Sequence, residues 1–254
     1  MEQERFLEAC RWAPSRENTR QGIGTLGEKT LHSAVKYYFQ PDPDMREVPV
    51  GPFVADALVD GGVVEVQTRS LYRLCPKLDY FLSQGKATVV YPVPAKKTVV
   101  WISPEGDMTP PRKSPLKPTA GQVLPELYGL REFLGHPGFS LCVLLLEVED
   151  YRLLNGWGRD KKRGSTRYER MPVSLLQEVW VRSPGEYGKL IPESLPPLFT
   201  SRELGRAVGV PSKRASSAAN VLQRVGAIRR EGKRGGAYLY TRAGTPCETA
   251  ATGG

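Results

Sequence analysis

The sequence predicts an α/β (α+β) protein, with one mixed β-sheet flanked by helices and a small C-terminal module of helices and strands. Between residues 26 and 102, segments with helical spacing of apolar residues alternate with short apolar β segments. Four prolines between residues 183 and 198 are typical of a linker. Beyond this stretch the pattern changes. We therefore expect an α/β domain over residues 1–182, a linker over 183–198, a second domain over 199–244 and a disordered tail over 245–254.

The whole chain favours a negatively charged partner. Lys and Arg number 36 against 27 Asp and Glu, which gives a net charge of +9. Nucleic acid is the first expectation and an anionic membrane surface the second. No apolar run approaches the roughly 20 residues of a transmembrane helix, and the N-terminus lacks an apolar secretion signal. The four cysteines are scattered without CxxC spacing, which fits free thiols and a cytoplasmic location.

The first element with a clear core face is a helix expected at 26–39. Leu31 and Val35 recur at helical spacing, and Glu28 projects along the same stripe. A carboxylate directed toward a core needs a partner. His32, one turn further on, is a hydrogen-bonding candidate for that role, and a direct functional role for Glu28 is the alternative. A further short helix is expected at 2–12.

A strand at 45–50 precedes a hairpin, FVADALVDGGVVEVQT, at residues 53–68. Asp60-Gly61 favours a two-residue turn, which places Asp56 opposite Glu65 on one face. Taking Gly61-Gly62 as the loop places Asp56 opposite Gln67 instead, still on the same face. Opposed like charges destabilise a sheet, so a divalent cation between the carboxylates is one interpretation. An exposed face whose acids meet water is the other.

The remaining elements of the first domain follow in order. A helix is expected at 71–84, with Gly85 ending it, and strands at 88–93 and 98–102. The five prolines within 103–119 predict an extended loop. A short helix at 123–134 and a strand at 139–149 complete the pattern.

A basic segment with flanking aromatic residues covers 156–170, GWGRDKKRGSTRYER. Most charge runs are merely solvated. Here Trp157 and Tyr168 flank the run, and this mixture suits phosphate contacts and base stacking. The predicted nucleic-acid contacts in this segment are Arg159, Lys161, Lys162, Arg163 and Arg167.

The C-terminal module contains a helix capped by a Thr-x-x-Glu box at Thr200, a second helix at 212–225 and β segments at 227–231 and 237–242. This order resembles a winged helix-turn-helix domain over residues 199–242. That segment holds ten basic and two acidic residues, a net +8. The resemblance implies DNA contacts, although a winged helix can also bind protein. The expected DNA-binding residues are Lys213, Arg214, Ser217, Asn220, Arg224, Lys233 and Arg234.

The helix with Glu28, the strand with Asp56 and the Glu65-x-Gln67 dyad together resemble the PD-(D/E)xK nuclease superfamily, whose core has a restriction-endonuclease-like mixed sheet. The resemblance covers about residues 23–93. It implies that Asp56, Glu65 and the carbonyl of Val66 ligate Mg²⁺ or Mn²⁺, with Glu28 contributing directly or through water.

One departure from the pattern is Gln67, which stands where lysine is expected. An amide orients water but brings no positive charge to the phosphorane. Glutamine occurs at this place in some active restriction-type members, and the lysine can migrate onto the following helix. Lys77 in the 71–84 helix is a candidate for that role, although a solvated helix lysine is the favoured interpretation.

The leading hypothesis is a Mg²⁺-dependent deoxyribonuclease with a winged-helix DNA-binding module. The alternative is a catalytically inactive nuclease-fold protein that acts as a DNA-binding or regulatory protein. RNA is a less favoured substrate, since helix-turn-helix geometry suits the DNA major groove. Double-stranded DNA is the expected partner, and a homodimer would suit double-strand cleavage.

Overall fold

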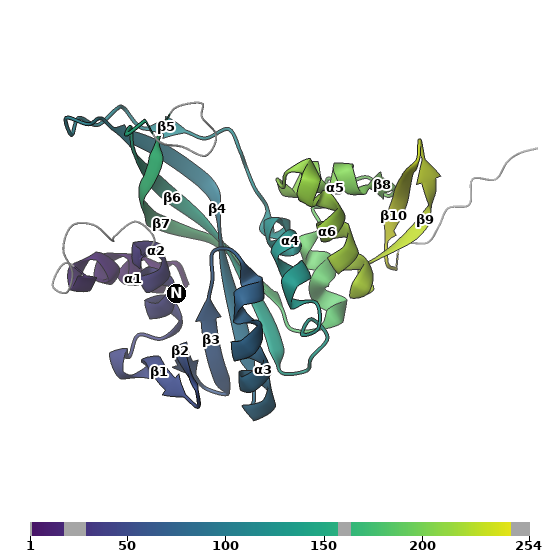
Figure 1. Cartoon of the computed structure of the whole chain (residues 1–254), viewed down its shortest axis with the longest axis horizontal. Coiled ribbons are helices and arrows are strands. Elements are labelled where there is room, and N and C mark those ends of the chain that lie inside the picture. Colours follow the sequence, from purple (N-terminus) through teal and green to yellow (C-terminus); the bar gives the residue numbers. More distant parts are fainter. Residues whose placement is uncertain (1, 18–28, 157–163, 245–254) are drawn as a thin grey trace, which may run out of the picture.

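A mixed β-sheet forms the centre of the protein (Figure 1). The computed structural model describes residues 2–17, 29–156 and 164–244. Within them, seven strands form one sheet in the order β1-β2-β3-β4-β6-β7, with β5 paired to β4. β3 and β6 run parallel to β4, and the other pairs are antiparallel. The strands are β1 Arg46–Val50, β2 Phe53–Val59, β3 Gly62–Val66, β4 Ala87–Ile102, β5 Arg112–Lys113, β6 Phe139–Leu153 and β7 Thr166–Val181. The predicted α/β class is confirmed.

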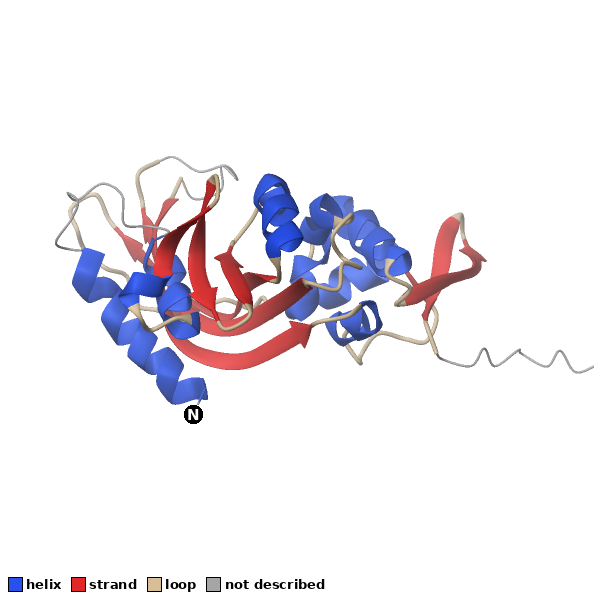
Figure 2. Ribbon diagram, turned by 90° about the horizontal axis from the view of Figure 1, so that it is seen from below, coloured by secondary structure: helices blue, strands red, loops and turns tan. Residues whose placement is uncertain are grey.

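Helices cover the sheet on both faces (Figure 2). On one face, Phe6 of α1 and Leu31 and Val35 of α2 pack with Val64 and Leu144. On the other face, a second core forms around α3 and α4. The helical elements of this part are α1 Glu2–Glu17, α2 Lys29–Phe39, η2 Pro43–Met45, η3 Leu71–Leu74, α3 Cys75–Gln84, η4 Ala120–Val123, α4 Leu124–Leu127, η5 Tyr128–Leu130 and η6 Pro184–Leu190. No helix of the described residues is long and apolar enough to cross a membrane.

Two features of the sheet differ from the sequence prediction. The segments 88–93 and 98–102 belong to one long strand, β4, whose pairing with β6 is irregular between Pro94 and Lys96. Pro92 and Pro94 still pair with β6, but the pairing of β3 with β4 ends at Val90, so on that other side no described strand pairs with these prolines and their missing N–H groups are tolerated. Strand β7 was not predicted, because its sequence lacks clean alternation and contains Pro172. It forms the edge of the sheet, where proline is acceptable.

The C-terminal elements follow the predicted order, α5 Ser201–Val208, α6 Ser212–Arg224, β9 Ile228–Arg234 and β10 Ala237–Arg242, with β8 Phe199–Thr200 completing a three-stranded sheet. The predicted capping box is confirmed: the Thr200 hydroxyl accepts from the Glu203 amide, and the Glu203 carboxylate accepts from the Thr200 amide.

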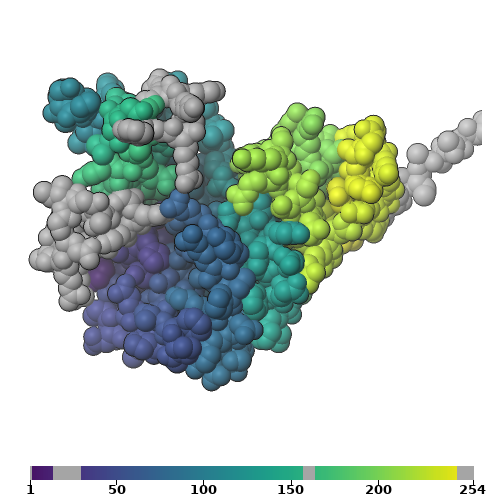
Figure 3. Space-filling view, in the orientation of Figure 1, coloured from purple at the N-terminus to yellow at the C-terminus, as the bar shows by residue number. Residues whose placement is uncertain are grey.

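The C-terminal elements pack against α4, and this junction is continuous in the space-filling view (Figure 3). Leu204 and Leu222 share one core with Leu127 and Leu130. Residues 183–198 also contribute to that core through Tyr187, Leu190, Ile191 and Leu195. The domain boundaries drawn from sequence stay a prediction.

Candidate active site

The hairpin of β2 and β3 brings Asp56 beside Glu65. Pairing of Val59 with Gly62 and of Leu58 with Val63 identifies Asp60-Gly61 as the turn, in agreement with the first of the two predicted registers. The amide N–H of Asp56 donates to Glu65 Oε1 at 3.3 Å. Gly61 has φ of +89°, which suits glycine in this turn. Local turn chemistry therefore fixes which two acids become neighbours.

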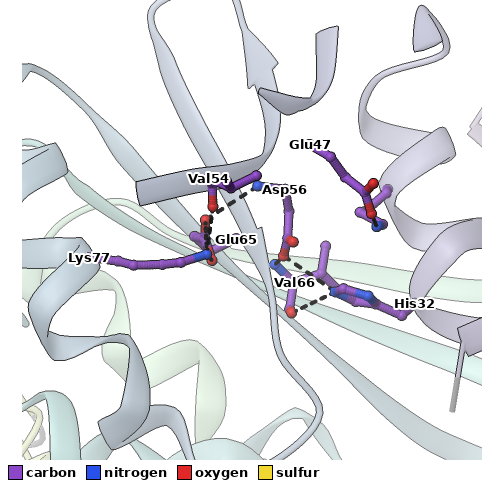
Figure 4. Close-up of polar contacts among 8 residues, drawn as sticks. His32, Glu47, Val54, Asp56, Glu65, Val66 and Lys77 are labelled. Atoms are coloured by element: carbon purple, nitrogen blue, oxygen red, sulfur yellow. Dashed lines mark hydrogen bonds and ion pairs between the residues drawn. The ribbon is translucent and has the colours of Figure 1, made fainter. Parts of the chain in front are cut away.

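The two carboxylates meet partners from different helices (Figure 4). Glu65 contacts Lys77 of α3, whereas Asp56 contacts His32 of α2. The expectation that both acids share one regular strand face is therefore wrong in detail. The pairing of β1 with β2 skips Asp56 and Glu47, and Glu47 has φ of +55°. This irregularity lies beside Asp56, where a regular ladder would have directed its side chain toward the α3 face.

Asp56 and the Val66 carbonyl converge on one nitrogen of His32. Nε2 of His32 lies 3.0 Å from the Val66 carbonyl oxygen and 3.3 Å from Asp56 Oδ2. The same Oδ2 accepts the Val66 amide N–H at 2.8 Å. These two oxygens are ones that the nuclease resemblance assigns to a metal. His32 was expected beside Glu28, which lies outside the described residues.

Lys77 lies inside the site. Its ammonium donates to Glu65 Oε2 at 2.9 Å, to Glu65 Oε1 at 3.1 Å and to the Val54 carbonyl at 2.7 Å. The favoured interpretation of Lys77 as a solvated helix lysine is wrong. Its helix was predicted correctly, but the rotation of that helix on the sheet depends on packing of Leu78 and Phe81 into the core, which the sequence does not fix.

The two acids have pKa values shifted in opposite directions. Burial, reinforced by the charge of Asp56, raises the pKa of Glu65 to about 7, although Lys77 acts in the other direction. Burial alone would raise the pKa of Asp56 as well. Its hydrogen bonds to His32 and the Val66 amide, together with the His32 charge, outweigh burial and hold that pKa below its ordinary value. Near neutral pH, Asp56 is ionised while Glu65 titrates, a separation typical of acid–base sites.

A second ion pair borders Asp56 on the α2 side. Lys36, one turn after His32, donates to Glu47 Oε1 at 2.7 Å. The Lys36 side chain is 11% exposed and Glu47 is 69% exposed. The hydrogen bond from Lys36 and its charge lower the pKa of Glu47. Sequence reasoning missed both residues, and the spacing of four between His32 and Lys36 was the one available signal.

The oxygen donors present suit a small hard cation. Mg²⁺ in proteins is often held by one or two carboxylates and several waters. Asp56 Oδ2 and the Val66 carbonyl are two such oxygens, and His32 Nε2 contacts both of them. Glu65 Oε1 lies 3.3 Å from the backbone nitrogen of Asp56. Among the described residues, no group of three or more His, Cys, Asp or Glu side chains is arranged to hold a metal. Gln67 directly follows β3, and its backbone N–H donates to the Val90 carbonyl.

The described residues cover only part of the predicted nucleic-acid contacts in the basic segment. Arg159, Lys161, Lys162 and Arg163 fall outside the described residues. Arg167 lies on β7, where its Nε is 3.2 Å from Asp150 Oδ1.

The outer face of α6 carries Lys213 and Asn220, both exposed, with Ser217 half-buried. Other predicted contacts already have partners within the chain. Arg214 binds Glu126 at 2.8 Å, and Arg224 binds Glu132 at 2.8 Å. On the β9–β10 hairpin, Arg234 binds Glu203, and Lys233 lies over the Tyr238 ring. DNA binding by these residues stays a prediction.

A known protein family matches the part of the chain that contains the β2–β3 hairpin. The family described as "Domain of unknown function (DUF8091)" matches residues 29–182, which contain both helices and both strands of the site. An uncharacterized protein of Treponema pallidum (strain Nichols) is 29% identical over 222 residues, covering 87% of each chain. No solved structure matches.

Proposed function

The chain belongs to the family described as "Domain of unknown function (DUF8091)", and we propose that it hydrolyses DNA phosphodiester bonds with the help of Mg²⁺ or Mn²⁺. The observation that carries this proposal is the contact between Lys77 and Glu65, next to Asp56 and the Val66 carbonyl. Two acids, a carbonyl and a lysine are the groups that the nuclease resemblance requires, and Lys77 supplies the lysine that position 67 lacks.

Each group has a distinct task in this proposal. The carboxylate of Asp56 and the carbonyl of Val66 would hold the cation, with Glu65 as the adjacent acid. The cation, when bound, polarises the scissile phosphate and lowers the pKa of the attacking water. Asp56 suits its task because its low pKa keeps it ionised. Glu65, with a pKa of about 7, exchanges a proton near neutral pH and so suits proton transfer with water.

Lys77 provides positive charge for the transition state. An ammonium near the reacting phosphate stabilises the developing negative charge, which an amide such as Gln67 cannot do. The contacts with Glu65 and the Val54 carbonyl hold the Lys77 ammonium in place. Because the Lys77 side chain is 28% exposed, a substrate phosphate can still reach it. Gln67 orients water in this scheme.

The substrate is proposed to be double-stranded DNA. The C-terminal segment 199–242 carries a net +8, and its helix α6 presents Lys213 and Asn220 to solvent. Small and basic side chains on an exposed helix suit the DNA major groove. Phosphate contacts from such residues make binding sensitive to salt.

Cleavage assays test the catalytic proposal. Supercoiled plasmid and labelled linear duplexes are incubated with the protein and Mg²⁺ or Mn²⁺, beside Glu65→Gln and Lys77→Met variants. Asp79→Asn is the matched control, because Asp79 is an exposed acid on the same helix as Lys77. We expect the wild type and Asp79→Asn to cut and the two site variants to lose activity. Equal products, or equal absence of products, from the wild type and Glu65→Gln would refute the proposal.

The second candidate function is a DNA-binding protein that keeps the nuclease architecture without turnover. It is favoured by His32, whose Nε2 contacts both Asp56 Oδ2 and the Val66 carbonyl. Calorimetric titration with Mn²⁺ separates the candidates. The nuclease requires binding that Asp56→Asn weakens, whereas the inactive protein shows no binding that depends on Asp56.

A further inference from the structure

A buried carboxylate gathers three arginines near one end of β6 and β7. Asp150 is fully buried. Its Oδ1 lies 3.0 Å from Arg170 Nε and 3.2 Å from Arg167 Nε, and its Oδ2 accepts from Arg152 Nε at 3.2 Å. Asp150 pairs directly with Arg170 across the two strands, and Arg152 pairs with Arg167. We call Asp150, Arg152, Arg167 and Arg170 the arginine cluster.

The contacts to Asp150 use one edge of each guanidinium. In all three arginines the atom nearest Asp150 is Nε. The terminal amino groups of Arg152 and Arg170 lie outside these contacts with Asp150. A guanidinium presents five donors in a rigid fork, and two of them together match a phosphate. Asp150 therefore orients the three guanidinium groups while its contacts occupy the Nε edge of each.

The charge of the cluster is not balanced by Asp150. One carboxylate faces three guanidinium groups, and Lys97 adds a fourth positive charge nearby. Burial lowers the pKa of Lys97, and the three arginines lower it further against the opposing effect of Asp150. Like charges held this close repel one another in a partly buried setting. An anion that enters the cluster relieves that repulsion.

The arginine cluster lies on the face of the sheet that α1 and α2 cover, where the contact between His32 and Asp56 also lies. Val148, two residues before Asp150, belongs to the core under α1 and α2, so alternation puts Asp150 on that face. Thr30 of α2 donates to Glu169, the neighbour of Arg170. His32 follows Thr30 by two residues and contacts Asp56. Helix α2 therefore connects the two groups of side chains.

Part of each arginine remains accessible. The side chain of Arg170 is 14% exposed, that of Arg152 28% and that of Arg167 39%. Figure 1 shows this end of β6 and β7 extending past α1 and α2, away from the C-terminal elements. A long, uniformly charged ligand with repeated phosphates is the ligand class that can reach this cluster and the candidate active site together.

We propose that Arg152, Arg167 and Arg170, oriented by Asp150, bind a phosphate in the backbone of the duplex DNA substrate. The proposal rests on the proposed function for the choice of DNA as the anion. It adds a second contact surface, separate from α6 and the β9–β10 hairpin, that sets where the duplex lies relative to Lys77 and Asp56.

Salt-dependent binding tests this proposal without any cleavage. Binding of the full-length protein to a fluorescein-labelled duplex is measured by anisotropy in EDTA at a series of NaCl concentrations. We expect Arg152→Gln/Arg170→Gln to weaken binding and to reduce the slope of log K against log[NaCl] by about 0.9 for each phosphate that the protein no longer neutralises. Arg182→Gln is the matched control, since Arg182 is an exposed arginine just beyond the opposite end of β7 and lies over Trp180.

Arg167→Gln provides a second variant, which we expect to fold even if the two less exposed arginines cannot be replaced, because Arg167 is the most exposed of the three. Folding of each variant is checked by thermal unfolding. An unchanged slope in Arg167→Gln and in every folded cluster variant refutes the arginine site, even if the wild type cuts DNA. A reduced slope in a protein that never cuts supports the site and refutes catalysis, so the two proposals fail independently.

Discussion

The ammonium of Lys77 lies 2.9 Å from the buried carboxylate of Glu65. Lys77 belongs to α3, the helix that follows the hairpin, and α3 lies across the sheet from His32 (Figure 4). Glu65 is 2% exposed and is the site acid whose pKa rises to about 7. In the proposed function, Lys77 supplies the positive charge that the amide of Gln67 does not carry.

Two replacements of Lys77 distinguish the effect of its positive charge on cleavage from the effect of its size. We expect Lys77→Met to lower the cleavage rate about 100-fold, since removal of one preorganised electrostatic contact in an active site typically costs that much. Lys77→Arg keeps the charge and is expected to retain part of the activity. Single-turnover cleavage rates at saturating DNA measure both, and equal rates for Lys77→Met and the wild type would contradict the assignment.

Glu65 makes the protein less stable as pH rises. Its pKa is about 7 in the folded state against 4.5 ordinarily, so the folded state binds more protons between these values. The free energy of unfolding should therefore fall from pH 4.5 to about pH 7 and then level off, by on the order of 3 kcal/mol from this group. Urea unfolding across this range, compared with Glu65→Gln, isolates the effect. A wild-type minus Glu65→Gln difference that stays constant with pH would contradict it.

Removal of His32 should change the ionisation of Asp56. The hydrogen bond and charge of His32 are the largest influences that lower this pKa. In His32→Ala, burial of Asp56 then dominates, and the pKa of Asp56 should rise. Carbon-13 NMR titration of the Asp56 carboxyl measures this change directly. His136→Ala is the control, because His136 lies in a distant turn, and a similar pKa of Asp56 in all three proteins would count against the His32 contact.

Glu126 joins the loop between β3 and η3 to the C-terminal helices. Its Oε2 accepts the Ser70 amide at 2.8 Å, and its Oε1 accepts from Arg214 of α6 at 2.8 Å. Ser70 has φ of +56°, which a non-glycine residue adopts with strain. We expect Glu126→Gln to destabilise the protein by about 1–2 kcal/mol and to speed hydrogen exchange at the Ser70 and Leu71 amides.

The exposed Glu132 provides a control for this prediction, because it also binds an arginine of α6. Glu132→Gln should leave exchange at Ser70 unchanged, since it contacts Arg224 rather than the loop. Protection of Ser70 that is equal in Glu126→Gln and the wild type would show that the loop does not depend on this contact.

The sequence by itself determined the local structure of the hairpin and the C-terminal helices. Asp60-Gly61 specifies a two-residue turn, and that turn brings Asp56 and Glu65 together. Thr200 and Glu203 specify the start of α5 through a capping box. These features depend on residues a few positions apart, so their chemistry is visible in the chain. The α/β order of elements around the site followed from the same local periodicities.

Tertiary structure decided which distant groups meet. The rotation of α3 turned Lys77 toward Glu65, and the packing of α2 brought His32 to Asp56 and the Val66 carbonyl. Pairing of β6 with β7 assembled the arginine cluster around Asp150 from residues up to 20 positions apart. Helix rotation and edge-strand pairing depend on how the two cores fill, and that packing is a property of the whole fold rather than of any one segment.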